Sequence, residues 1–117
     1  MTAVSPVDPA YDDGMLRITW LPQGNGFLVE GTVDVSNRSG LAAALAAAAQ
    51  RSGDVQVDLS GLEFIDMDGA RLLVRAARGL ASGRLLVLRQ MPSHLRELLR
   101  AVNTDDAPGL RWEQTEG

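Results

Sequence analysis

The sequence has no cysteine, no lysine and a single histidine, so all eleven of its basic residues are arginine. Without cysteine, disulfides and thiolate metal sites are excluded. With one histidine, a transition-metal site would need to be built from carboxylates, and no carboxylates cluster at ligand spacing. We therefore expect neither a metal nor a cofactor.

Long hydrophobic runs are also absent. The longest, Leu-Ala-Ala-Ala-Leu-Ala-Ala-Ala-Ala at 41–49, is too short and too rich in alanine to cross a bilayer. The first fourteen residues contain neither the basic nor the apolar region of a secretion signal. A net charge of −4 disfavours general nucleic-acid binding. These features predict a cytoplasmic protein with no nucleic-acid or membrane partner.

The common catalytic motifs are missing as well. Neither a phosphate-binding G-x-x-x-x-G-K-[ST] loop nor a G-x-S-x-G nucleophile turn occurs. Asp66 and Asp68 are spaced like the carboxylate pair of an acid–base catalyst, but the sequence shows no partner residue that would take the complementary acid or base role. A phospho-acceptor site of the receiver type would need an acidic pair after the first strand and a lysine, and both are absent. We expect a protein that is not an enzyme.

Periodic apolar patterns predict an α/β domain. Five segments have strand patterns: 15–21, 27–35, 55–59, 84–89 and 110–113. Three have helical patterns: one between Ser36 or Asn37 as N-cap and Gly53 as stop, then 68–80 and 92–102. The order β-β-α-β-α-β-α-β predicts a mixed sheet with helices packed on it. We expect a flexible N-terminal tail at 1–14, one domain at 15–113 and a C-terminal tail at 114–117.

The stretch Phe-Ile-Asp-Met-Asp-Gly at 64–69 lies between a strand pattern and a helix pattern. Asp68 stands where a helix N-cap is expected, where its carboxylate would accept an amide hydrogen bond. Asp66 is not needed for that cap, so the presence of a second carboxylate here needs another explanation.

Three other features have simple structural explanations. His94, in the first turn of the last helix, is expected to be exposed to solvent. The arginines at 71, 75 and 78 share a helical face that we expect to be solvated, although it would also suit an acidic partner. The alanine-rich helix is expected to pack closely on the sheet, and its small side chains would also permit a homodimer.

The segment Val-Asp-Leu-Ser-Gly-Leu-Glu-Phe-Ile-Asp-Met-Asp-Gly at 57–69, with the leucine-rich helix after it, resembles the core motif of STAS domains, the anti-sigma factor antagonist family. The family pattern is a strand ending in Asp-Leu-Ser, an apolar link, and Asp-Ser-Ser-Gly or Asp-Ser-Thr-Gly opening a helix. The segment 30–37 is similar to the family's Gly-Glu-Leu-Asp region, with Asp34 at its aspartate, and 91–103 looks like its third helix. The resemblance covers about residues 15–113.

The resemblance implies a bacterial, cytoplasmic signalling domain that regulates transcription by protein–protein contact. In the family, the second hydroxyl residue of the turn is phosphorylated by a serine kinase that is also the anti-sigma factor, and phosphorylation blocks binding. Asp66 matches the family's first aspartate, whereas Met67 and Asp68 replace the two hydroxyl residues. The phospho-site position therefore holds a fixed carboxylate, and neither Ser36 nor Ser60 matches it. Asp68 would either imitate the phosphorylated state or serve as a co-adapted contact.

The partner expected from this resemblance is an anti-sigma factor or related serine kinase-like protein. Its contact surface is expected at the turn, at the start of the following helix and in the loop of Asp34. The residues assigned to it are Asp34, Asp66, Met67, Asp68, Gly69 and Arg71. Met67 is expected to be exposed, because it takes the place of a polar residue. Two alternatives are a sensor of a small ligand or nucleotide, with a pocket near Asp34 and the loop 60–69, and a scaffold in a signalling complex.

Overall fold

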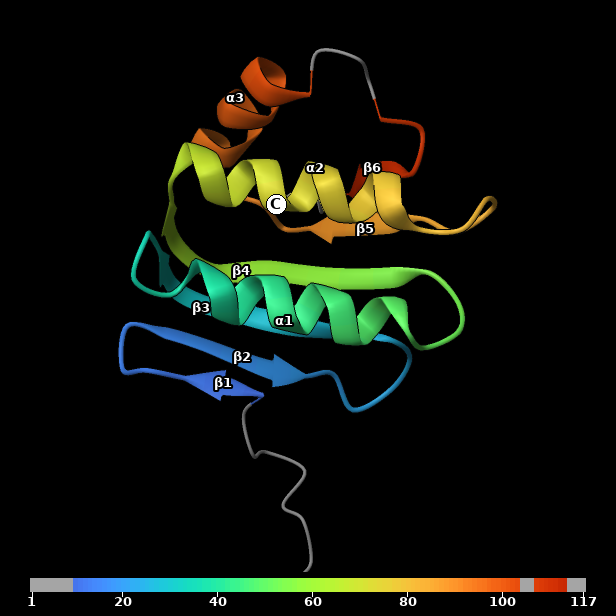
Figure 1. Ribbon diagram of the computed structural model, residues 1–117. Coiled ribbons are helices and arrows are strands. Elements are labelled where there is room, and N and C mark those ends of the chain that lie inside the picture. Colours follow the sequence, from blue (N-terminus) through green and yellow to red (C-terminus); the bar gives the residue numbers. More distant parts are fainter. Residues whose placement is uncertain (1–9, 104–106, 114–117) are drawn as a thin grey trace, which may run out of the picture.

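The computed structural model describes residues 10–103 and 107–113 of the chain. Its centre is a six-stranded sheet in which the strands follow one another in chain order (Figure 1). The strands are β1 (Tyr11–Asp12), β2 (Leu16–Trp20), β3 (Gly26–Val33), β4 (Val55–Ile65), β5 (Leu86–Arg89) and β6 (Leu110–Glu113). The pairs β1–β2 and β2–β3 are antiparallel, and the three remaining pairs are parallel. The predicted mixed α/β sheet is confirmed.

Three helices connect the parallel strands: α1 (Arg38–Ala49), α2 (Met67–Gly79) and α3 (Ser93–Val102). Parallel strands joined by right-handed crossovers in sequential order place their helices on one face of the sheet. Accordingly, α1 and α2 lie side by side over the sheet, and α3 packs against α2 (Figure 1). Both α1 and α2 begin at the same end of the sheet, because both follow parallel strands.

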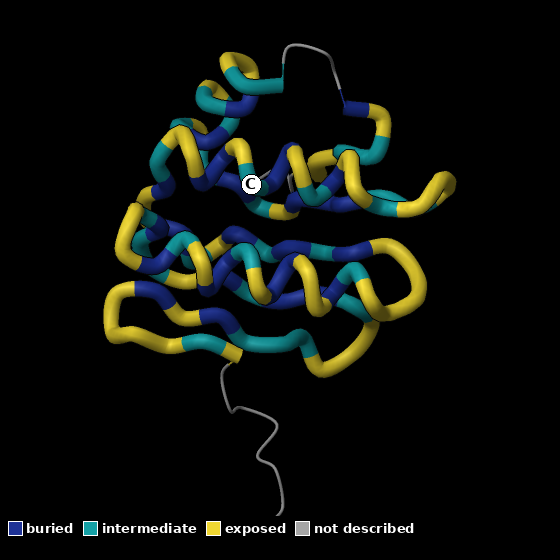
Figure 2. Tube along the Cα trace, in the orientation of Figure 1, coloured by how far each residue is buried: buried dark blue, intermediate teal, exposed yellow. Residues whose placement is uncertain are grey.

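The buried residues, which lie on both the strands and the helices, form one core cluster (Figure 2). Alternation along β4 turns Val55, Val57 and Leu59 toward the helices, and all three are buried. Helix α3 contributes Leu95 and Leu99, which are fully buried at i, i+4 spacing. Burial of each such side chain contributes about 1.5–3 kcal/mol. The apolar patterns read from the sequence therefore select the buried face of each element.

Two elements differ from the sequence expectation. Tyr11 and Asp12, which the sequence places in the N-terminal tail, form the edge strand β1 and pair with Ile18 and Arg17. Strand β4 continues to Ile65 rather than ending at Leu59, because it remains paired with β3 through two register shifts. The apolar alternation is interrupted at Ser60 and Gly61, so sequence periodicity does not reveal this continuation.

The long β3–β4 pair positions the two loops of interest. Val33 lies opposite Ile65 at the end of this pair, and the Asp66 amide donates to the Val33 carbonyl at 3.2 Å. Asp34 and Asp66 are the next residues on the two strands. The loop before α1 and the turn before α2 are thereby adjacent.

Candidate functional site

Asp66, not Asp68, is the N-cap of α2. Its backbone is extended (φ −82°, ψ 174°), and its Oδ1 accepts a hydrogen bond from the Gly69 amide at 2.8 Å. The helix begins at Met67, so Asp68 lies within its first turn. The prediction that Asp68 is the cap was wrong by two residues. A carboxylate at either position also faces the positive end of the helix dipole.

Gly69 permits close packing beneath this turn. A Cβ atom added to Gly69 would lie 2.6 Å from Ile65 Cγ1 and 3.2 Å from Asp66 Oδ1. Ile65 is buried and β-branched, so it cannot easily move away. Glycine at this position is therefore explained by packing of the turn.

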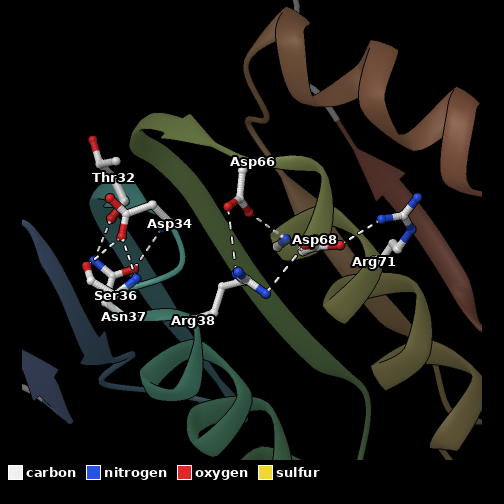
Figure 3. A network of polar contacts seen from close by, with 9 residues as sticks. Thr32, Asp34, Ser36, Asn37, Arg38, Asp66, Asp68 and Arg71 are labelled. Carbon is white, nitrogen blue, oxygen red and sulfur yellow. Dashed lines mark hydrogen bonds and ion pairs between the residues drawn. The ribbon is translucent and has the colours of Figure 1, made fainter.

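Two arginines surround the carboxylates of the turn (Figure 3). Arg71 Nη1 donates to Asp68 Oδ1 at 2.7 Å, one helical turn away. Arg38, which comes from the first turn of α1, has Nε 3.7 Å from Asp66 Oδ2 and Nη1 3.6 Å from Asp68 Oδ2. Two carboxylates thus face two guanidinium groups, and the charges of this cluster balance.

Arg38 is the residue of the cluster that sequence reasoning missed. A signal was present, because the residues that follow two neighbouring parallel strands meet at the same edge of the sheet. Arg38 follows β3 and the turn follows β4, so an attraction between them could have been proposed. Arg71, which the sequence places on an exposed helical face, lies beside Asp68.

Asp34 organises its own loop rather than joining the turn. Its Oδ1 accepts from the Ser36 amide at 2.9 Å and from the Ser36 hydroxyl at 2.6 Å. Asn37 is fully buried, accepts from the Asp34 amide at 2.9 Å and donates to the Thr32 carbonyl at 3.0 Å (Figure 3). Asn37 occupies the N-cap position of α1, but its side chain makes no capping hydrogen bond. It holds the loop to the end of β3 instead.

A partly apolar hollow lies on the other side of the turn. Met67 is exposed, as predicted, with 40% of its surface accessible, and Phe64 is 49% exposed. With His94 and Leu98 from α3, these residues line a hollow of about 500 Å³ that also includes Asp66. Asp34 is not among the lining residues of this hollow.

His94 is not the solvated residue that the sequence suggests. Its Nε2 accepts a hydrogen bond from the Ile65 amide at 3.2 Å, and its ring is stacked on Phe64 with centroids 5.6 Å apart. The histidine therefore ties α3 to the end of β4. It also holds the exposed Phe64 ring in one orientation.

Among residues 10–103 and 107–113, no group of three histidine, cysteine or acidic side chains could hold a metal ion. Within the same residues, no helix is long and apolar enough to span a membrane.

The comparisons with known proteins agree with the geometry. The family model described as "Mlab, STAS domain" matches residues 22–111, so this chain belongs to the STAS domain family. No curated protein is significantly similar to it.

Two solved structures share the fold. An anti-sigma factor antagonist from Mycobacterium paratuberculosis is 20% identical with a TM-score of 0.64, and the match covers 90% of this chain and 89% of that one. An anti-sigma-factor antagonist (STAS) domain protein from Planctomyces limnophilus is 20% identical with a TM-score of 0.56, over 88% and 92% of the two chains.

Proposed function

We propose that this STAS domain is a non-catalytic regulatory module of the cytoplasm that binds an anti-sigma factor or a related serine kinase-like protein. The fold it shares with the two anti-sigma factor antagonists supports this class of partner. The proposed contact surface combines the turn, the start of α2 and the loop of Asp34. Its residues are Asp34, Asp66, Met67, Asp68, Gly69 and Arg71.

The observation that carries this proposal is the exposure of Phe64 and Met67 next to the charged turn. Both side chains border the hollow that His94 and Leu98 complete. Protein interfaces commonly have apolar anchors surrounded by polar groups, and aromatic and methionine side chains are enriched in them. Val35, in the loop of Asp34, is a further exposed apolar residue, with 78% of its surface accessible.

We further propose that Asp68 is a partner contact and that the domain binds constitutively. A phosphoserine carries about −1.5 to −2 charges, which would dominate the local field. Asp68 carries one charge, and Arg71 and Arg38 both lie within 3.6 Å of its carboxylate. The balanced cluster therefore resembles an unmodified, binding-competent turn more than a phosphorylated one. No hydroxyl residue is present at 66–69, so the usual switch cannot operate there.

Affinity capture from native lysate, followed by mass spectrometry, tests the proposed function. The immobilised wild-type domain should enrich one protein with the ATPase fold of serine kinase-like anti-sigma factors. The Met67→Ser variant should lose it. Met15→Ser is the matched control, since Met15 is also exposed (54%) but lies just before β2, outside the proposed contact surface. A co-purified small molecule without any protein partner would instead support the ligand-sensor alternative.

A further inference from the structure

A narrow apolar slot lies between α1 and α2, over the sheet. Its volume is about 290 Å³, roughly twice the 150 Å³ of an apolar cavity that accepts benzene. Its walls and floor are almost entirely aliphatic, and Arg75 is the charged residue among them. The lining includes Ala42, Leu45, Ala46, Leu72, Leu80 and Leu86.

The slot stays open because α1 presents alanines toward α2. Ala42 and Ala46 have no atoms beyond Cβ to fill the space above the floor. Leu72 of α2 is only partly buried and forms the opposite wall. Covering this partly exposed aliphatic surface with an apolar group would be favourable.

The end of the slot near the start of α2 is cationic. A second hollow of about 370 Å³ shares Ala42, Leu72 and Arg75 with the slot and adds Arg38, Arg71 and Asp68. Arg38 and Arg71 are balanced by Asp66 and Asp68, so Arg75 adds one positive charge in excess at this end. Among the described residues, Arg75 is joined to no carboxylate by an ion pair, and the contacts of Arg38 are long, at 3.6 and 3.7 Å. This end is built to receive an additional anion.

We propose that the slot and its cationic end form a binding site for a single-chain anionic amphiphile, a medium-chain fatty acid. The carboxylate would lie among Arg38, Arg71 and Arg75, and the alkyl chain would extend along the slot from Leu72 toward Leu80. That distance is roughly 12 Å at 1.5 Å per residue, which suits an extended alkyl chain.

Calorimetric titration with sodium decanoate, kept below its micelle concentration, tests the proposal. We expect saturable binding of one decanoate per domain. Ala46→Leu should abolish it by filling the slot, and leucine is a good helix former, so circular dichroism should show an intact fold. Ala43→Leu is the matched control: it makes the same change at an exposed position of α1 that does not line the slot, and it should bind as the wild type does.

The cationic end is tested separately. Arg75→Gln should weaken decanoate binding about tenfold, as expected for loss of one charged hydrogen-bonding group. Arg100→Gln, an exposed arginine on α3, should have no effect. Decyltrimethylammonium, which has the same chain and the opposite charge, should bind at least about tenfold more weakly than decanoate. Absence of saturable decanoate binding, or binding that Ala46→Leu leaves unchanged, would overturn the proposal. A third outcome would also overturn the proposal: the wild type does not bind decanoate, and Ala46→Leu loses the captured protein partner. The slot would then be a protein contact.

Discussion

Arg38 on α1 and Asp68 on α2 approach within 3.6 Å, across two helices that are separated in the chain by the whole of β4. This contact places a cation beside Asp68, the residue for which we propose a role in partner contact. It connects the two parts of the proposed contact surface. It also partly neutralises the negative charge that the carboxylates would present to a partner.

Replacing Asp68 by serine should change the free energy of unfolding by less than about 1 kcal/mol, because the partner Arg71 is exposed and one turn away. If Asp68 is a contact, Asp68→Ser should bind the captured partner more weakly. Addition of ATP should weaken binding further, as the new serine is modified and gains charge. Affinity measured for wild type and variant with and without ATP checks this. Tighter binding of Asp68→Ser would show that Asp68 imitates phosphorylation.

Replacing Met67 by serine should reduce partner affinity with little effect on stability, because Met67 is exposed. The melting temperature should fall by less than about 4 °C, which corresponds to about 1 kcal/mol for a domain of this size. Thermal denaturation followed by circular dichroism measures this. A larger fall would mean that Met67 supports the core, and the loss of binding would then have no bearing on the interface.

Replacing Asn37 by alanine should destabilise the domain by about 2–3 kcal/mol. The change leaves the Asp34 amide and the Thr32 carbonyl without their partner next to a buried position. Ser36→Ala, in the same loop but exposed, should cost less than about 1 kcal/mol. Urea denaturation of both variants compares the two costs. Equal losses in the free energy of unfolding would show that the buried hydrogen bonds of Asn37 stabilise the domain no more than the exposed ones of Ser36.

Two glycines of α2 should respond in opposite directions to alanine. Gly69→Ala should destabilise by about 1–3 kcal/mol, because its Cβ would overlap Ile65. Gly79→Ala, where a Cβ meets nothing within 4 Å, should be neutral or should stabilise by up to about 1 kcal/mol. The difference between the two midpoints in urea tests how tightly the turn is packed. A stabilising Gly69→Ala would mean that Ile65 moves freely.

Nucleotides should bind weakly or not at all. The chain has no lysine and no phosphate-binding glycine loop, and its net charge is −4. Calorimetric titration with ATP and with GTP measures this directly. Sub-micromolar binding of either nucleotide would make the ligand-sensor alternative the better explanation of the domain.

The sequence by itself determined the mixed α/β sheet, the helices of the second half and the position of the charged turn. These features follow from local physics: apolar periodicity selects the buried face of each element, and a carboxylate before a helix is a cap. Local pattern did not decide which carboxylate caps, since Asp66 and Asp68 both suit the role.

Only the tertiary structure decided what surrounds the turn. Arg38 meets Asp66 and Asp68 because the β3–β4 pair ends with Val33 opposite Ile65. His94 accepts a hydrogen bond from the amide of Ile65, 29 residues away in the chain. The slot between α1 and α2 also depends on how two helices lie side by side. Such contacts join residues that are distant in the chain, and periodicity within one element contains no information about its neighbours in space.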